Sequence, residues 1–184
     1  MEALINIHLQ HIDEAVVRSV LEHWPKKSNR LAELLIHSYG MPHEATQTML
    51  IWYYNSPWKK TILHRDGAYH NMPHSHVDIL EQTIDAKVSP EVCSEIMKFD
   101  GSIMINRTRG EMTAYCESER ANTFILNLAH DIALGRKTAR EARKVLMQSE
   151  DLFRNVWPNP YREALQFEAT IQADDPDRIT AEPG

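Results

Sequence analysis

The sequence has few of the residues that organise disulfide-rich and membrane proteins. Only two of its 184 residues are cysteines, Cys93 and Cys116, and they do not form a C-x-x-C pair. Neither a disulfide framework nor a cysteine zinc site is therefore expected, and we expect both residues to be small buried hydrophobes. No run approaches the roughly 18 apolar residues that a bilayer-spanning helix needs, so no membrane association is expected.

Basic charge is also scarce. The chain has 20 Lys and Arg against 26 Asp and Glu, a formal net charge of -6. A nucleic-acid footprint needs clustered Lys and Arg, but the longest basic runs are the doublets Lys26-Lys27 and Lys59-Lys60. The N-terminus lacks the basic start and unbroken apolar core of a signal peptide. We therefore expect a soluble, cytoplasmic protein with no nucleic-acid partner.

Length and apolar content fit one globular domain. Hydrophobic residues make up 42% of the chain, which is enough for one core and short for two. No linker or fixed-period repeat divides the sequence. The last residues, ADDPDRITAEPG, are polar and acidic. We expect a single domain over residues 1–172 and a flexible acidic tail over 173–184.

Apolar spacing and capping signals predict a mainly α fold, a single-domain helical bundle with one or two short antiparallel β-hairpins. Helical periodicity and start and stop residues define the expected helices. These cover residues 4–24, 28–39, 42–55, 75–85 (or from Pro73), 90–99, 118–134, 138–155 and a short segment from Asn159. Asp66-Gly67 and Arg109-Gly110 are typical hairpin turns. They predict hairpins over 59–70 and 102–116, the second with Ile103, Ile105, Met112, Ala114 and Cys116 on one face.

Four of the ten histidines lie within HRDGAYHNMPHSH, residues 64–76. Neutral imidazole is a common ligand for zinc, iron and nickel, often together with a carboxylate. A helix from Pro73 would place His74 and Asp78 one turn apart on a face that continues to Glu81. The candidate ligands of a divalent transition metal are therefore His64, His70, His74, His76 and Asp78. The metal-free alternative is a cluster held by hydrogen bonds to backbone or carboxylates.

The register of the first hairpin decides whether His64 and His70 can cooperate. A two-residue turn at Asp66-Gly67 puts these histidines on opposite faces. A three-residue loop over residues 65–67 puts them on the same face. The sequence leaves both registers open, and only the second brings His64, His70 and His74 into a composite site.

Two functions follow from these features. The first is metal binding through residues 64–78, in a binding protein or a metal-dependent enzyme with Glu81 or Asp131 as acid or base. The second is a non-catalytic interaction or oligomerisation module, in which the aromatic-rich segment 50–58 and the hairpins form the interface of a homo-oligomer. For neither function does the sequence identify a small-molecule ligand.

His130-Asp131, within LAHDIALG, resembles the doublet of the HD-domain phosphohydrolases, in which a His, a His-Asp doublet and a later Asp bind metal. The resemblance implies a metal-dependent phosphohydrolase with an upstream histidine completing the set. The upstream candidates are His70, His74 and His76. Asp151 is the one candidate for the later Asp before the tail. This third function predicts that His130 and Asp131 approach the histidine-rich window.

Overall fold

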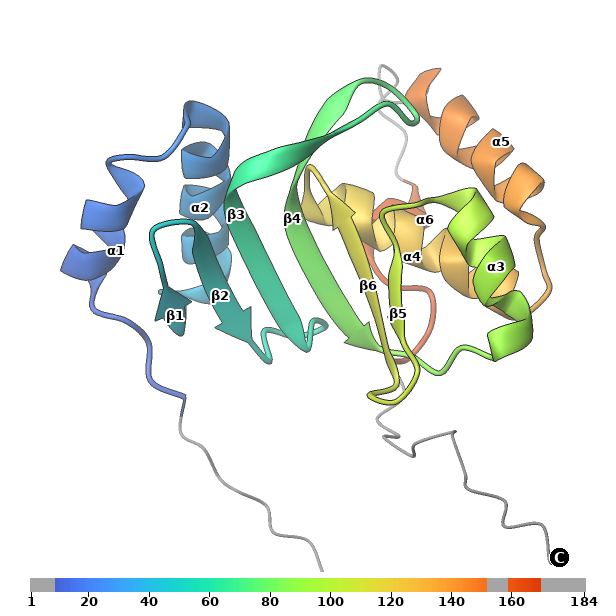
Figure 1. Ribbon diagram of the computed structural model, residues 1–184, viewed down its shortest axis with the longest axis horizontal. Coiled ribbons are helices and arrows are strands. Elements are labelled where there is room, and N and C mark those ends of the chain that lie inside the picture. The colour runs from blue at the N-terminus through green and yellow to red at the C-terminus, as the bar shows by residue number, and fades with distance from the viewer. Residues whose placement is uncertain (1–8, 152–158, 170–184) are drawn as a thin grey trace, which may run out of the picture.

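A six-stranded antiparallel sheet is the centre of the fold (Figure 1). The structure, a computed structural model, describes residues 9–151 and 159–169. The strand order is β1-β2-β3-β4-β6-β5. The strands are β1 (Glu44–Ala45), β2 (Met49–Tyr53), β3 (Lys60–His70), β4 (His76–Asp85), β5 (Met104–Asn106) and β6 (Glu111–Cys116). β4 is therefore a central strand, paired with β3 on one side and with β6 on the other.

The helices form a second layer on one face of this sheet. They are α1 (Glu14–Leu21), α2 (Lys26–Tyr39), α3 (Pro90–Phe99), α4 (Glu119–Ala133), α5 (Ala139–Asp151) and α6 (Pro160–Glu163). Leu50, Leu63, Leu80 and Cys116 form one row across four strands, and so point to the same face. Leu50, Leu63 and Leu80 share a core with buried residues of α1 and α2, while Cys116 shares one with α4.

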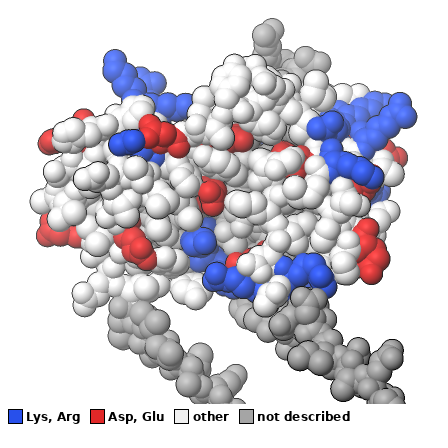
Figure 2. Space-filling view, viewed as in Figure 1, with Lys and Arg blue, Asp and Glu red and all other residues white. Residues whose placement is uncertain are grey.

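The other face of the sheet carries the alternate residues, including the row Ile51, Ile62, Glu81 and Tyr115. α2 and α4 lie behind the sheet in the view of Figure 1. Figure 2 shows the same side of the molecule, on which charged side chains lie mostly toward the edges and the surface over the sheet is largely without them. The protein is thus a two-layer α+β structure. None of the helices described is long and apolar enough to cross a membrane.

The prediction of a mainly helical bundle is wrong, because two expected helices are strands. Residues 42–55 contain β1 and β2, and residues 75–85 contain β4. Seven of the ten β4 residues are buried, since α4 covers one face and strands flank both edges. On the face without helices, Ile79 and Thr83 are only 2% exposed, so burial does not alternate along β4 as it does in a half-exposed strand. The remaining apolar spacing resembled that of a helix.

The predicted hairpin over 59–70 is also wrong. These residues form the single strand β3, and the chain turns after it, between His70 and His76. The β3–β4 register shifts between Leu63 and Ala68, so Asp66-Gly67 lies in an irregularity of the strand. Neither of the two turn registers considered for this segment is formed.

Several local predictions are confirmed. α2, α3, α4 and α6 form where expected, although Pro25 rather than Ser28 precedes the first turn of α2. Thr138 and Glu141 make the reciprocal hydrogen bonds of a capping box. The second hairpin forms and keeps the predicted face, but the predicted two-residue turn at Arg109-Gly110 is wrong, because the turn spans four residues, 107–110.

Other boundaries differ or stay untested. The expected helix 4–24 is shortened to α1, because Asp13 caps it and residues 9–13 are not helical. Residues 4–8, the extension of α5 to residue 155 and the acidic tail at 173–184 lie outside the described residues.

Candidate metal centre

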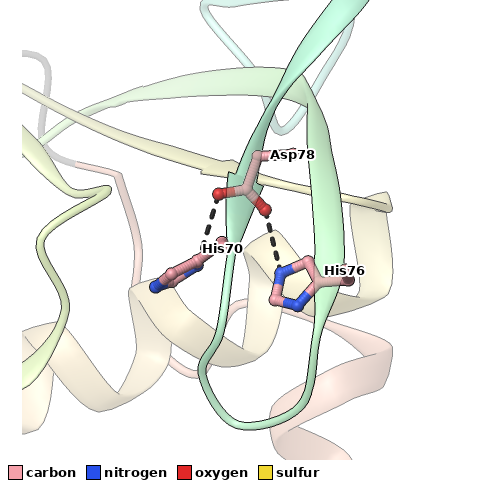
Figure 3. A group of neighbouring side chains, drawn as sticks. All are labelled: His70, His76 and Asp78. Carbon is pink, nitrogen blue, oxygen red and sulfur yellow. Dashed lines mark ion pairs between the residues drawn. The ribbon is translucent and has the colours of Figure 1, made fainter.

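His70, His76 and Asp78 meet where β3 and β4 join (Figure 3). His70 pairs with His76 across the two strands, and Asp78 lies two residues after His76, on the same face of β4. One potential ligand atom from each residue lies within 4.8 Å of the other two. Within residues 9–151 and 159–169, this is the one such group of three or more His, Cys, Asp or Glu side chains.

The Asp78 carboxylate lies between the two imidazoles. Its Oδ1 is 2.9 Å from His76 Nε2, and its Oδ2 is 3.3 Å from His70 Nδ1. The side chains of His76 and Asp78 are 3% exposed, whereas that of His70 is 24% exposed. The group is therefore reached from solvent past His70.

The hydrogen bonds of His76 determine which of its nitrogens is free to bind. Its Nδ1 lies 2.8 Å from the carbonyl oxygen of His74. Because a carbonyl only accepts, Nδ1 carries the proton, and the Nε2 of a neutral ring presents a lone pair. That lone pair faces Asp78 Oδ1, which is also an acceptor. A cation between these two atoms, either a metal ion or a proton, is needed to make the contact favourable.

Two buried atoms of the cluster lack a directed hydrogen bond among the described residues. They are His70 Nδ1 and Asp78 Oδ1. Burial raises the pKa of Asp78, and the nearby His76 and His70 oppose this shift. A buried carboxylate is costly unless a cation compensates it. The cluster thus has the donor set and the charge requirement of a cation site.

Residues from β6 and α2 surround the cluster. Cys116 Sγ lies 3.3 Å from His76 Nε2, and burial raises the pKa of this thiol. Glu117 accepts a 3.0 Å hydrogen bond from Lys27 Nζ and lies 3.5 Å from His74 Nε2. Burial alone would raise the pKa of Glu117, but the Lys27 hydrogen bond and charge outweigh it and lower the pKa.

Sequence reasoning missed Cys116 and Glu117 as neighbours of the site. Cys116 was expected to be a small buried hydrophobe, and its side chain is only 4% exposed. Its position beside the histidines follows from the pairing of β6 with β4. The only sequence feature that bore on the position of Cys116 was the shared apolar face of the second hairpin. That feature did not indicate that β6 pairs with β4.

The other predicted ligands lie outside the group of three. His74 is on the turn and faces Glu117. His64 is opposite Met49 of β2, and its Nε2 lies 2.8 Å from Glu81 Oε1 on the uncovered face of the sheet. Glu81, a predicted acid or base, therefore contacts His64 rather than the group of three.

His130 and Asp131 contact the segment that contains α6. Asp131 Oδ2 accepts hydrogen bonds from Lys137 Nζ at 2.6 Å and from the Tyr161 hydroxyl at 2.9 Å. The His130 ring stacks on Phe167, with ring centroids 3.9 Å apart. Neither residue joins a metal-ligand group with the histidine-rich window among the residues described. These contacts give the doublet a role in packing.

The aromatic segment 50–58 is mainly part of the core. Trp52 is fully buried and Trp58 is 2% exposed, whereas Tyr54 is 73% exposed. Comparisons of the chain with protein-family models, with curated proteins and with solved structures found no match. The geometry of the His70, His76 and Asp78 group therefore carries the functional interpretation.

Proposed function

We propose that the protein binds a divalent transition metal ion through His70, His76 and Asp78. The observation that carries this proposal is the 2.9 Å contact between His76 Nε2 and Asp78 Oδ1, in which two acceptors face each other. Two imidazoles and one carboxylate suit zinc, iron or nickel. The hydrogen bond from His76 Nδ1 to a backbone carbonyl is typical of the outer-shell contact that orients a ligating histidine.

Metal binding would also stabilise the junction of β3 and β4. The ligands come from the end of one strand and the start of the next, so one ion would hold the two strands together. Because the ligands converge only in the folded chain, metal binding would contribute to the free energy of folding. Three protein ligands with an open position would also permit catalysis.

Elemental analysis of untagged protein, purified without chelator, tests the proposal. The test variant is His76→Ala/Asp78→Ala. The matched control is His64→Ala/Glu81→Ala, which removes the other histidine and carboxylate pair of these strands, on the opposite face. We expect near-stoichiometric metal in the wild type and the control, and its loss in the test variant. The proposal fails if the wild type binds none after supplementation with zinc, iron or nickel, or if the test variant retains it.

The interaction-module hypothesis leads to a second proposal, that the uncovered sheet face forms the interface of a homo-oligomer. The observation that favours it is that Ile51, Ile62 and Tyr115 share a row with Glu81, on the face of the sheet away from α2 and α4. Light scattering after size exclusion tests it, with Ile62→Lys expected to convert an oligomer to a monomer. A monomeric wild type at high protein concentration would contradict it.

A further inference from the structure

We propose that Cys116 is the fourth ligand, so that the ion is held in a closed four-coordinate site by one thiolate, two imidazoles and one carboxylate. This inference rests on the proposed metal-binding function and deepens it. It assigns the ion a structural role in place of a catalytic one.

The strand pairing places the thiol beside the other ligands. Cys116 is opposite Leu80, so its side chain lies on the same face of the sheet as those of Asp78 and His76. Its Sγ is 3.3 Å from His76 Nε2, the nitrogen that also faces Asp78. Both contacts converge on the lone pair that the His76 tautomer leaves free.

Three separations among these atoms are close to those expected of tetrahedral ligands. Typical zinc bond lengths imply a sulfur to nitrogen separation of roughly 3.5 Å and a nitrogen to oxygen separation of roughly 3.3 Å around one ion. The corresponding separations here are 3.3 Å for Cys116 and His76, 2.9 Å for His76 and Asp78, and 3.3 Å for His70 and Asp78. The two imidazole nitrogens face different oxygens of Asp78, and Cys116 is not among the side chains whose ligand atoms all lie within 4.8 Å of one another. Side-chain rotation is therefore needed for one ion to contact all four ligands.

Charge balance gives an independent reason for the fourth ligand. A divalent cation with two neutral imidazoles and one carboxylate keeps a net charge of +1 in a site where His76 and Asp78 are almost fully buried. A thiolate cancels that charge, and burying a neutral group costs far less than burying a charged one. On binding, the Cys116 sulfur forms a bond to the metal and its thiol proton passes to solvent.

The ligand set also narrows the metal and its role. A thiolate selects zinc among the common divalent ions and disfavours magnesium, calcium and manganese. Four protein ligands leave no position for water or substrate, which is the arrangement of structural zinc sites. The ion would then tie together β3, β4 and β6, three neighbouring strands of the sheet.

Cobalt(II) titration of the full-length protein tests this assignment. Cobalt replaces zinc in such sites, and a cobalt–thiolate bond adds a charge-transfer band in the near ultraviolet. The test variant is Cys116→Ser, and the matched control is Cys93→Ser, which alters the chain's other cysteine, on α3. We expect the band in the wild type and in the control. In the test variant the band should be absent. The affinity for cobalt should be at least about 10-fold lower, because losing even an outer-shell partner of a metal site typically lowers the affinity by that much.

The outcomes separate this inference from the proposed function. Cobalt that binds stoichiometrically without the charge-transfer band overturns the assignment of Cys116 and leaves the three-ligand site standing. A band that persists in Cys116→Ser, or that disappears in Cys93→Ser, also overturns it. Absence of cobalt and zinc binding overturns the assignment of Cys116, and absence of iron and nickel binding as well overturns both proposals. Because the band is read in the wild type, the result stands even where Cys116→Ser does not fold.

Discussion

Gly67 of β3 lies directly against the backbone of Asp78 in β4. A Cβ built on Gly67 would overlap the Asp78 carbonyl oxygen and lie 2.5 Å from Val77 Cγ1. A glycine inside a strand commonly marks such a close backbone approach. The absence of a side chain at Gly67 therefore lets β3 approach β4 closely at Asp78. The carboxylate of Asp78 lies between the imidazoles of His70 and His76.

Gly67→Ala is expected to destabilise the protein. The added methyl group must push β3 away from β4, and such overpacking typically costs about 1–3 kcal/mol. Urea denaturation should show a lower midpoint with an unchanged slope. Gly101→Ala is the matched control, because no atom lies within 4 Å of the position of its Cβ. Equal midpoints for the two variants would show that the strand separation is not fixed by residue 67.

Zinc removal is expected to loosen the β3–β4 hairpin. An ion at 100 times its dissociation constant stabilises the folded state by about 2.7 kcal/mol, which slows exchange through the corresponding opening about 100-fold. Hydrogen exchange with zinc and with chelator should differ most at the backbone amides of residues 69–79. If hydrogen exchange in His76→Ala/Asp78→Ala responds to zinc in the same way, the effect comes from zinc bound elsewhere.

Asp131 is expected to stabilise the protein at neutral pH. Burial raises the pKa of this carboxyl, but hydrogen bonds from Lys137 and Tyr161 outweigh burial, and the net pKa is lowered from 3.8. The contribution is therefore fully present above the unfolded-state value and is lost as the pH falls through the lower folded-state value. Asp131→Asn should cost about 1–3 kcal/mol at pH 7.

A pH series of denaturant midpoints measures this contribution. The difference between wild type and Asp131→Asn should narrow below pH 3.8, the ordinary pKa of the carboxyl. Asp66→Asn is the control, because Asp66 forms an exposed ion pair with Arg65 and exposed pairs contribute little. A difference that stays constant as Asp131 is protonated would assign the effect to packing.

Asn127 is expected to hold the segment around α6 against α4. Its side chain is 1% exposed, donates to the carbonyl oxygens of Tyr161 and Ala164, and accepts from the amide of Gln166. Asn127→Ala removes all three bonds and should cost about 1–3 kcal/mol. Limited proteolysis should then cleave within residues 159–169 faster than in the wild type. Asn106→Ala, at the exposed end of β5, is the control, and equal cleavage rates would contradict the assignment.

The position of the candidate site was only partly predictable from the sequence. The window 64–76 contains His70 and His76, and Asp78 follows two residues later, so these residue types indicated a metal site. The expected arrangement of the ligands was wrong, because it relied on a helix from Pro73 and a turn at Asp66-Gly67. The structure brings the three residues together by pairing two strands instead. Asp-Gly favours a hairpin turn locally, but here the glycine serves the close approach to Asp78.

The sequence by itself determined the features that depend on neighbouring residues. Examples are the Ser118 cap of α4, the Thr138–Glu141 capping box, and the positive φ angles of Gly40 and Gly135. Capping bonds and positive φ angles are satisfied within a few residues, so a short stretch of sequence contains their cause.

Tertiary structure alone decided the sheet and the neighbours of the site. β4 is a strand because β3, β6 and α4 bury it, and Asn122 of α4 contacts Leu80 and Gln82 of β4 across separations of 42 and 40 residues along the chain. Cys116 reaches His76 because β6 pairs with β4 in one register, with a separation of 40 residues along the chain. Such pairings are selected by the packing of the whole core.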